Sequence, residues 1–423
     1  MCSQQAVLVN KVNMPSRIRA PIPTHGAHER LYYLDWLKML AVLGVFYAHV
    51  AWLFDMLYHW QIENNSRGSA IVIFGAQWGM ALIFLLAGAS AWFSLGSRTG
   101  RQFIGERFAR LVIPFIAGVI LIAPPQAYFM DLSRSLYHGS FLQYYLYYIS
   151  HIRLLLSPQS LTAYGFQLWF LVFLFLFSLL ALPLFLYLRR EQGQRFISWL
   201  AALCERQGGI FILILPIALI QIALGPPFPE YPGWAYIFSW LVYFVYGYLF
   251  MADPRFEKAI RKQGMTALSI GIASLLAIVF MMYAPGYMNI WESTPGYSVP
   301  YELYELLFSI AAWSWMIFAL YFGMRFLNSG NKIIQYAYEA VLPFYILHFF
   351  IIVVITFFFV QWEVNIVARY LLVSTLALAT TLAVYDLLIR RVSAARWLFG
   401  MKPRKQESDP HEKSGREVRS TVE

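Results

Sequence analysis

The stretch YYLDWLKMLAVLGVFYAH, residues 32–49, is apolar enough to cross a membrane and yet contains Asp35, Lys38 and His49. A transmembrane helix needs about 20 mostly apolar residues to cross a hydrocarbon core about 30 Å thick. In lipid, a single span must satisfy its own backbone hydrogen bonds, and only a helix does so. The stretch therefore predicts the first span of a helical membrane protein, with ionisable groups inside the span.

The whole chain has the composition of an integral membrane protein. Of its 423 residues, 60% are hydrophobic and only 13% are charged, and the mean hydropathy is +0.56. An average soluble domain has about 25% charged residues. The formal net charge of +10 is not a sign of nucleic-acid binding here, because the basic residues lie between apolar blocks. We expect the lipid bilayer as a partner and no nucleic acid.

Ten apolar blocks follow one another along the chain. They lack the short alternating pattern of barrel strands, so each block predicts a transmembrane helix. The fold class that we expect is an all-α, polytopic integral membrane protein with about ten transmembrane helices. The predicted spans cover residues 36–57, 70–95, 111–129, 167–188, 209–227, 233–251, 266–284, 303–326, 339–360 and 366–388.

The distribution of basic residues predicts the orientation. The N-terminal segment, the loops after the second, fourth, sixth and eighth spans, and the C-terminal tail, counted together with Arg325 at the cytoplasmic end of the eighth span, hold 27 of the 32 Lys and Arg residues. The other loops hold three, and two lie within spans. Cytoplasmic loops carry an excess of Lys and Arg, so both termini are predicted to be cytoplasmic.

Three regions are expected along the chain. Residues 1–30 form a cytoplasmic N-terminal segment, residues 31–398 form the transmembrane domain, and residues 399–423 form a charged, disordered cytoplasmic tail. The longest loop on the opposite side, residues 130–166, contains the aromatic stretch FLQYYLYYISHIRLLL. We expect this stretch to lie at the interface or to cover the bundle.

Lys38 and His49 are eleven residues apart, which is close to three helical turns. Their side chains therefore project from nearly the same face, about 16 Å apart along the axis. Ionisable groups inside a membrane tend to face a cavity or the bundle interior. Lys38 would then meet a ligand at the cytoplasmic mouth while His49 lies near mid-membrane. The alternatives are that Lys38 reaches back to the headgroups and that His49 is a hydrogen-bonded interior residue.

A second histidine is predicted at a similar depth. In YEAVLPFYILHFF, residues 338–350, His348 lies about 13 Å into the ninth span. A neutral imidazole at this depth can accept a proton from a hydroxyl group. Two histidines can also bind a metal, but no carboxylate or cysteine accompanies either one at ligand spacing, so we predict no metal site.

A basic cluster precedes the third span in GRQFIGERFARLVIPF, residues 100–115. Arg107 and Arg110 are three residues apart and lie on one face of a helix. Guanidinium groups in such a pair can bind phosphate through forked contacts. The alternative is that the arginines anchor the loop to anionic headgroups.

These motifs together resemble the membrane-bound acyltransferase family 3, and within it the glucan-modifying branch typified by glucans biosynthesis protein C. The resemblance covers about residues 30–400. The family's Leu-Asp-x-Leu-Arg motif, followed by a His after ten intervening residues, is similar to LDWLK and His49, with Lys38 in the Arg position. The other matching segments, in chain order, are IFLLAGAS at 83–90, RFARLVIP at 107–114, LWFL at 168–171, and Tyr345 with His348.

The resemblance implies a bacterial inner-membrane enzyme that moves an acyl group, such as acetyl or succinyl, from cytoplasmic acyl-CoA to a hydroxyl of a glycan. Acyl-CoA is then a co-substrate, and no cofactor is bound. The family's catalytic histidine corresponds to His49, and its donor-handling basic residues correspond to Lys38, Arg107 and Arg110. A lysine keeps the positive charge of the arginine that it replaces but not the forked contact.

In the mechanism that we favour, His49 removes the proton of the acceptor hydroxyl as its oxygen attacks the thioester. Candidate donors to the developing oxyanion are Tyr345, His348, Gln167 and Trp169. A covalent acyl-histidine intermediate is the other route.

Four polar residues are predicted in the outer half of the spans: Asp55, Glu302, Glu305 and Arg369. One interpretation is that they contact the acceptor, and the alternative is that they are plain interface residues. The rival functions are a secondary transporter and an inactive scaffold, and the oligomeric state is left open.

Overall fold

The computed structural model describes residues 30–58, 67–153, 155–283, 297–359, 362 and 364–402, without the side chains of 55–58, 67–74, 76, 77, 282 and 283. Most of the predicted N-terminal segment 1–30 and of the tail 399–423 therefore lies outside the described residues. No β-strand occurs among the described residues. This all-helical structure confirms the expected fold class.

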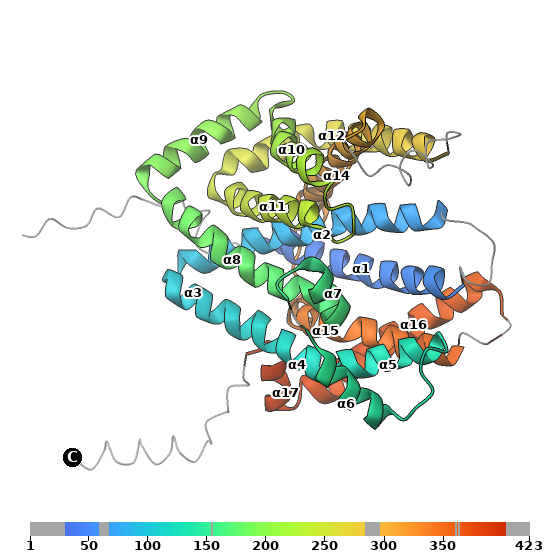
Figure 1. Ribbon diagram of the computed structural model, residues 1–423. Helices are drawn as coiled ribbons and strands as arrows, with labels where there is room; N and C mark the ends of the chain where they lie inside the picture. Colours follow the sequence, from blue (N-terminus) through green and yellow to red (C-terminus); the bar gives the residue numbers. More distant parts are fainter. Residues whose placement is uncertain are drawn as a thin grey trace, which may run out of the picture. The chain divides into compact units, whose positions relative to one another are not determined.

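Eight helical segments are long and apolar enough to cross a membrane, counted over the described residues. They are arranged as in Figure 1, and α7 and α8 together make one of them. Their helices are α1 (Tyr32–Tyr58), α2 (Arg67–Gly96), α7 (Pro158–Gly165), α8 (Trp169–Leu188), α11 (Trp234–Ala252), α12 (Pro254–Tyr283), α14 (Val299–Phe326), α15 (Lys332–Phe359) and α16 (Ile366–Val384).

Shorter elements complete the chain. Single 3-10 turns precede α8 and α10, and π-helical turns follow α3 and α16. The shorter elements are α3 (Gly100–Arg107), the π turn Phe108–Val112, α4 (Ile113–Leu121), α5 (Ala123–Ser133), α6 (Phe141–His151), the 3-10 turn Phe166–Leu168, α9 (Glu191–Glu205), the 3-10 turn Gly209–Leu213, α10 (Ile214–Leu224), the π turn Tyr385–Ile389 and α17 (Ser393–Leu398).

The remaining two predicted spans form less regular segments. The third block forms a ninth candidate span that is bent by 43° between Leu121 and Ala123. Pro124 and Pro125 follow the bend in the first turn of α5, where proline is tolerated because its missing N–H would have no intrahelical acceptor. The fifth block forms Gly209–Leu224, a shorter apolar helix. The prediction of a multi-pass helical membrane protein is confirmed.

Small residues allow α2 and α11 to pack closely. A Cβ atom placed on Gly88 would overlap the carbonyl oxygen of Phe244, and one placed on Gly247 would overlap the carbonyl oxygen of Leu85. Helices in membranes associate through such close backbone approach, because lipid gives no hydrophobic force between them. This packing fixes the position of α2, which also contacts α1.

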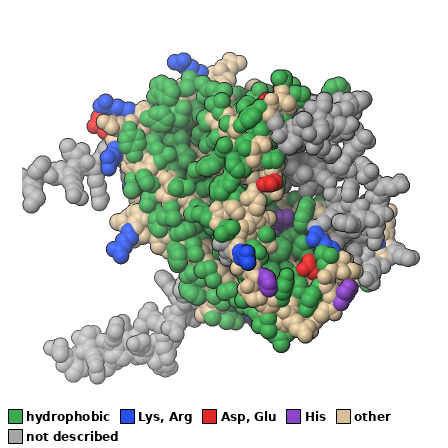
Figure 2. Space-filling model, in the orientation of Figure 1, with side chains coloured by type: hydrophobic (Ala, Val, Ile, Leu, Met, Phe, Trp, Pro, Cys, Tyr) green, Lys and Arg blue, Asp and Glu red, His purple; other side chains and the backbone are tan. Residues whose placement is uncertain are grey.

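Hydrogen bonds connect helix ends that are predicted, from the distribution of Lys and Arg, to be cytoplasmic. The Arg189 guanidinium donates to the Leu95 carbonyl oxygen over 2.9 Å, which links the ends of α8 and α2. The Trp36 indole donates to the Ser329 carbonyl oxygen over 3.0 Å, near the start of α1. Figure 2 shows hydrophobic side chains over most of the face in view, with several Lys and Arg side chains at its left margin.

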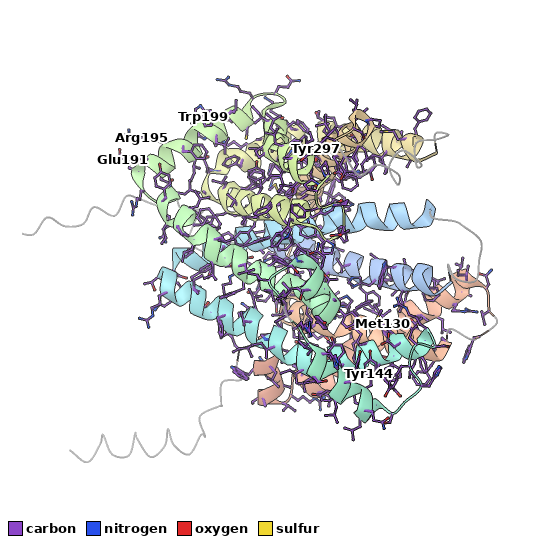
Figure 3. The ribbon with its side chains drawn as sticks, in the orientation of Figure 1. Met130, Tyr144, Glu191, Arg195, Trp199 and Tyr297 are labelled. Carbon is purple, nitrogen blue, oxygen red and sulfur yellow. The ribbon has the colours of Figure 1, made fainter. Side chains whose placement is uncertain are left out.

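The aromatic stretch of the 130–166 loop forms α6, which packs on α5. The Tyr144 hydroxyl donates to the Asp131 carboxylate over 2.5 Å, and the Tyr148 hydroxyl donates to the Tyr164 carbonyl oxygen over 2.7 Å. Figure 3 labels Tyr144 on this helix. Leu142 is exposed on the other side of α6. The helix is thus amphipathic, as expected for a segment that covers the bundle at the membrane interface.

Candidate active site

Two histidines from distant parts of the chain meet inside the bundle. His49 belongs to α1 and His348 to α15, and these two helices pack against each other. The Nδ1 atom of His49 lies 2.9 Å from the Nε2 atom of His348. His348 is fully buried and His49 is half-buried, so His49 is the more accessible member of the pair.

The hydrogen bonds of His348 determine which nitrogens carry protons in a neutral pair. Its Nδ1 atom lies 2.7 Å from the Tyr345 carbonyl oxygen and 3.2 Å from that of Phe344. Carbonyl oxygens only accept, so this Nδ1 atom donates and the Nε2 atom is left as an acceptor. His49 must then donate from Nδ1, which leaves its own Nε2 atom with a lone pair. The pair thus presents one basic nitrogen.

Aromatic rings surround the histidine pair. The Phe349 ring lies 4.7 Å from the His49 ring, and the Phe344 ring is stacked on His348 at 5.8 Å between centroids. Phe46 completes this side of the pair at 6.2 Å from His348. Such apolar surroundings lower the local dielectric constant and strengthen the hydrogen bond between the imidazoles.

Tyr345 and Gln167 join α15 to the turn before α8. The Tyr345 hydroxyl donates to the Gln167 carbonyl oxygen, and the Gln167 amide donates to the Ile346 carbonyl oxygen over 3.1 Å. Gln167 follows Phe166, whose φ of 48° is unusual for a residue other than glycine. The Tyr345 proton is thus engaged with the backbone, and a donor role toward an oxyanion would require this bond to break.

Trp169 lies beside this turn at the start of α8. Its ring stacks on that of Trp240, with 5.2 Å between centroids, and the side chain is buried. This contact joins α8 to α11 and keeps the indole in a packed layer. The hydrogen bonds of Gln167, together with the Phe170 ring 5.4 Å from that of Tyr345, place the start of α8 next to Tyr345.

Lys38 points into the bundle between α1 and α2. Its Nζ atom donates to the Ser90 hydroxyl over 2.7 Å, and that hydroxyl donates to the Leu86 carbonyl oxygen over 2.9 Å. Ser90 is the last residue of the stretch IFLLAGAS, one of the segments that match the family motifs. Sequence reasoning did not single out Ser90, although its place at the end of that stretch was a usable signal.

Arg107 and Arg110 lie on either side of a change in helix geometry. Arg107 is the last residue of α3, and its guanidinium lies 5.1 Å from the centre of the Phe103 ring. Arg110 is in the π turn Phe108–Val112, whose wider turn rotates it further from Arg107 than a continuous α-helix would. Arg107 is half-buried and Arg110 is exposed.

The other predicted polar residues are not brought to the histidine pair by any described contact. Glu305 is buried on α14, where its Oε2 atom has no hydrogen-bond donor among the described residues. Arg369 is largely buried on α16 and donates to the Val364 carbonyl oxygen over 3.2 Å. The Asp55 side chain lies outside the described residues. Within the described part of the chain, no group of three or more His, Cys, Asp or Glu side chains is arranged to hold a metal ion.

The helices and the interior histidine pair define a polytopic membrane protein with a polar site inside its bundle. A family model described as an acyltransferase domain matches residues 31–389. The chain therefore belongs to this family, acyltransferase family 3, and is an acyltransferase that transfers groups other than aminoacyl groups. The match does not favour the transporter alternative. Comparisons with curated proteins and with solved structures give no match.

Proposed function

We propose that this membrane acyltransferase moves an acyl group, such as acetyl or succinyl, from acyl-CoA to a hydroxyl of a glycan. The observation that carries the proposal is the contact between His49 and His348, because it leaves the Nε2 atom of His49 as a base. The glucan-modifying branch of the family is the acceptor class that the motif resemblance favours. The same resemblance favours the bacterial inner membrane, and the distribution of Lys and Arg favours cytoplasmic termini, with the donor on that side.

The proposed reaction begins when the His49 Nε2 atom removes the proton of the acceptor hydroxyl. The hydroxyl oxygen attacks the thioester carbonyl, and the tetrahedral intermediate then expels the CoA thiolate, which receives the proton from His49. The products are an ester on the acceptor and free CoA. In this scheme His348 is a positioning residue, because it holds the Nδ1 proton of His49 and thereby fixes the reactive tautomer.

A second route passes through an acyl group carried on the His49 Nε2 atom. The same lone pair would attack the thioester directly, CoA would leave, and the acceptor hydroxyl would then take the acyl group from the imidazole. Incubation with radiolabelled acyl-CoA in the absence of an acceptor, followed by mass spectrometry of the protein, distinguishes the routes. Label on His49 supports the covalent route, and its absence under conditions of rapid transfer supports direct attack.

The proposal is tested with purified protein in nanodiscs, radiolabelled acyl-CoA and a glucan acceptor. We expect His49→Ala to insert and fold while losing transfer by about 10²–10⁴-fold, as for a lost general base. His151→Ala is the matched control, because His151 is an exposed histidine of α6. Near-wild-type turnover in His49→Ala would end the proposal, as would uptake of a solute without acyl transfer.

The donor side of the proposal assigns the phosphates of acyl-CoA to Arg107 and Arg110. Replacing either arginine with alanine should weaken acyl-CoA binding, and the loss should be smaller for a donor that lacks the 3′-phosphate. The exposed Arg110 is also suited to anchoring at headgroups. If donor binding is unchanged and the membrane orientation shifts, anchoring is the correct interpretation.

A further inference from the structure

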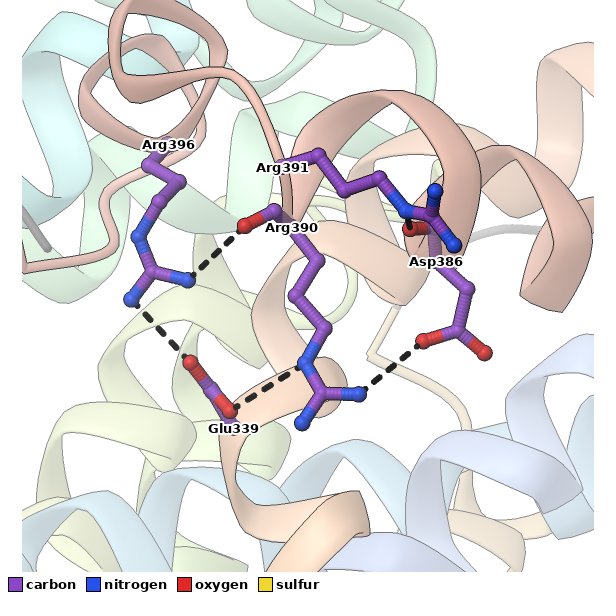
Figure 4. Close-up of a pocket in the computed structure, with 5 residues that line it drawn as sticks. All are labelled: Glu339, Asp386, Arg390, Arg391 and Arg396. Carbon is purple, nitrogen blue, oxygen red and sulfur yellow. Dashed lines mark hydrogen bonds and ion pairs between the residues drawn. The ribbon is translucent and has the colours of Figure 1, made fainter.

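A charged pocket of about 530 Å³ lies between the start of α15 and the residues that follow α16. Five charged side chains line this arginine pocket (Figure 4): Glu339, Asp386, Arg390, Arg391 and Arg396. None of them was singled out in the sequence as a site residue. The three guanidinium groups outnumber the two carboxylates, so the pocket has an excess of positive charge.

The two carboxylates already have donors. One oxygen of Glu339 accepts from Arg396 over 3.1 Å, and the other lies 3.9 Å from the Arg390 Nε atom. One oxygen of Asp386 accepts from the Tyr336 hydroxyl over 3.0 Å, and the other accepts from Arg390 over 3.4 Å. The acidic side chains are therefore engaged in orienting the arginines, and they are not open sites for a cation.

The guanidinium groups, by contrast, have donors to spare. Arg391 donates from Nε to the Asp386 carbonyl oxygen over 3.2 Å, and neither of its Nη atoms has an acceptor within the described part of the chain. The Nη2 atom of Arg390 likewise has no acceptor among the described residues. Arg396 differs, because it donates to Glu339, to the Lys402 carbonyl oxygen and to the Arg390 carbonyl oxygen. The spare donors thus belong to Arg390 and Arg391.

The backbone brings these two arginines together at the pocket. They directly follow the π turn Tyr385–Ile389, which ends the helix begun by α16. The segment after α17 then packs on the other π turn, where a Cβ atom placed on Gly400 would lie 2.7 Å from the Arg110 carbonyl oxygen. The pocket is therefore connected through α17 to the helix that carries the candidate donor arginines.

We propose that the arginine pocket binds a phosphate group through Arg390 and Arg391. A phosphate has the oxygen acceptors that the spare Nη atoms lack, and guanidinium groups bind it through parallel hydrogen bonds. The phosphate belongs either to a soluble phosphate ester or to a phospholipid headgroup, since both offer the same oxygens at the end of the bundle that the charge distribution makes cytoplasmic. This inference does not rest on the proposed acyl transfer.

The test uses the full chain in detergent and two probes, adenosine 3′,5′-bisphosphate and phosphatidylglycerol. The main variant is Arg391→Gln, which removes spare donors and leaves both carboxylate contacts of Arg390 and Arg396 in place. The matched control is Arg195→Gln. Arg195 pairs with Glu191 over 2.5 Å on the outer side of α9 (Figure 3) and lies on the same predicted side of the membrane.

We expect the wild type to bind at least one probe, and Arg391→Gln to weaken that binding by about tenfold or more. Arg195→Gln should change it by less than about twofold, as for a screened surface charge. The probe that responds identifies the source of the phosphate. Arg391→Lys, which keeps the charge without the fork, provides the same comparison if the glutamine variant does not fold. Equal affinities in the Arg391 and Arg195 variants, or no binding of either probe to the wild type, would overturn the proposal.

Discussion

The Nδ1 atom of His49 lies 2.9 Å from the Nε2 atom of His348, and this contact joins positions 299 residues apart in the sequence. A line of hydrogen bonds runs from the Tyr345 carbonyl oxygen through His348 to His49. Each bond in the line fixes the direction of the next, because the carbonyl oxygen can only accept. A backbone oxygen of α15 thus determines which nitrogen of His49 is basic.

This line of hydrogen bonds predicts that different substitutions of His348 reduce activity to different extents. We expect His348→Ala to lower kcat, by less than His49→Ala does, with little change in KM for the donor. His348→Gln should keep more activity, because its side-chain oxygen can still accept from the His49 Nδ1 atom. The double variant should be no slower than His49→Ala alone, since residues that act as a unit are not additive. Steady-state kinetics of the wild type and the four variants measure this, and additive losses would show that His348 acts separately.

The packing of α2 on α11 predicts a large difference between two glycines. Gly88→Ala should destabilise the protein by about 1–3 kcal/mol, because the new Cβ atom would overlap the Phe244 carbonyl oxygen and the backbone would have to move. Gly44 is the matched control, since no atom lies within 4 Å of a Cβ atom placed on it. Thermal unfolding in detergent compares the two variants. Equal melting temperatures for Gly88→Ala and Gly44→Ala would contradict the close packing.

The start of α12 predicts a dependence of stability on pH. Burial disfavours the charged form of Asp253, but hydrogen bonds from the Arg255 side chain and backbone N–H hold the pKa of this carboxyl below its usual value of 3.8. A carboxylate with a lowered pKa stabilises the folded state above its unfolded pKa, and this stabilisation is lost as the pH falls through the folded pKa.

Asp253→Ala should therefore cost about 1 kcal/mol at pH 7, as for a lost helix cap. The difference from the wild type should stay constant down to about pH 5 and shrink below about pH 4. Melting temperatures of both proteins between pH 7 and pH 3 provide the measurement. A difference that grows as the pH falls would show that the carboxylate is not stabilising.

The spans and the depth of the histidines were predictable, whereas the contacts of the site were not. Hydropathy over about twenty residues indicates a span, and the rise per residue gives a depth for His49 and His348. Their contact also depends on how α1 and α15 are rotated against each other, and this rotation is decided by packing across the whole bundle. Residue spacing alone contains no such information.

The relative orientation of Arg107 and Arg110 also could not be predicted from residue spacing. A spacing of three residues predicts one helical face for Arg107 and Arg110, but the prediction assumes an unbroken α-helix. A π turn has more residues per turn than an α-helix, so it changes the angle between the two arginines. No residue type in Phe108–Val112 predicts this turn. The sequence likewise gives no indication of the π turn before Arg390. The arginine pocket could therefore be found only from the structure.

Lys38, the residue that departs from the family pattern, contacts Ser90, and this contact makes its role in donor binding testable. If the charge of Lys38 attracts the donor, Lys38→Arg should keep most of the donor affinity, because the guanidinium is also positive and can add a forked contact. Lys38→Met, of similar length, should weaken donor binding by about tenfold through the loss of a charge-assisted hydrogen bond. His49 should remain functional in this variant, since the two residues lie about 16 Å apart along the helix.

Ser90→Ala removes the hydroxyl that accepts from Nζ and leaves the charge, so its effect should be smaller than that of Lys38→Met. Titrations of the donor against the four proteins decide between a ligand contact and a structural one. Equal affinities for Lys, Arg and Met at position 38 would remove Lys38 from the donor site and leave its bond to Ser90 as a link between α1 and α2.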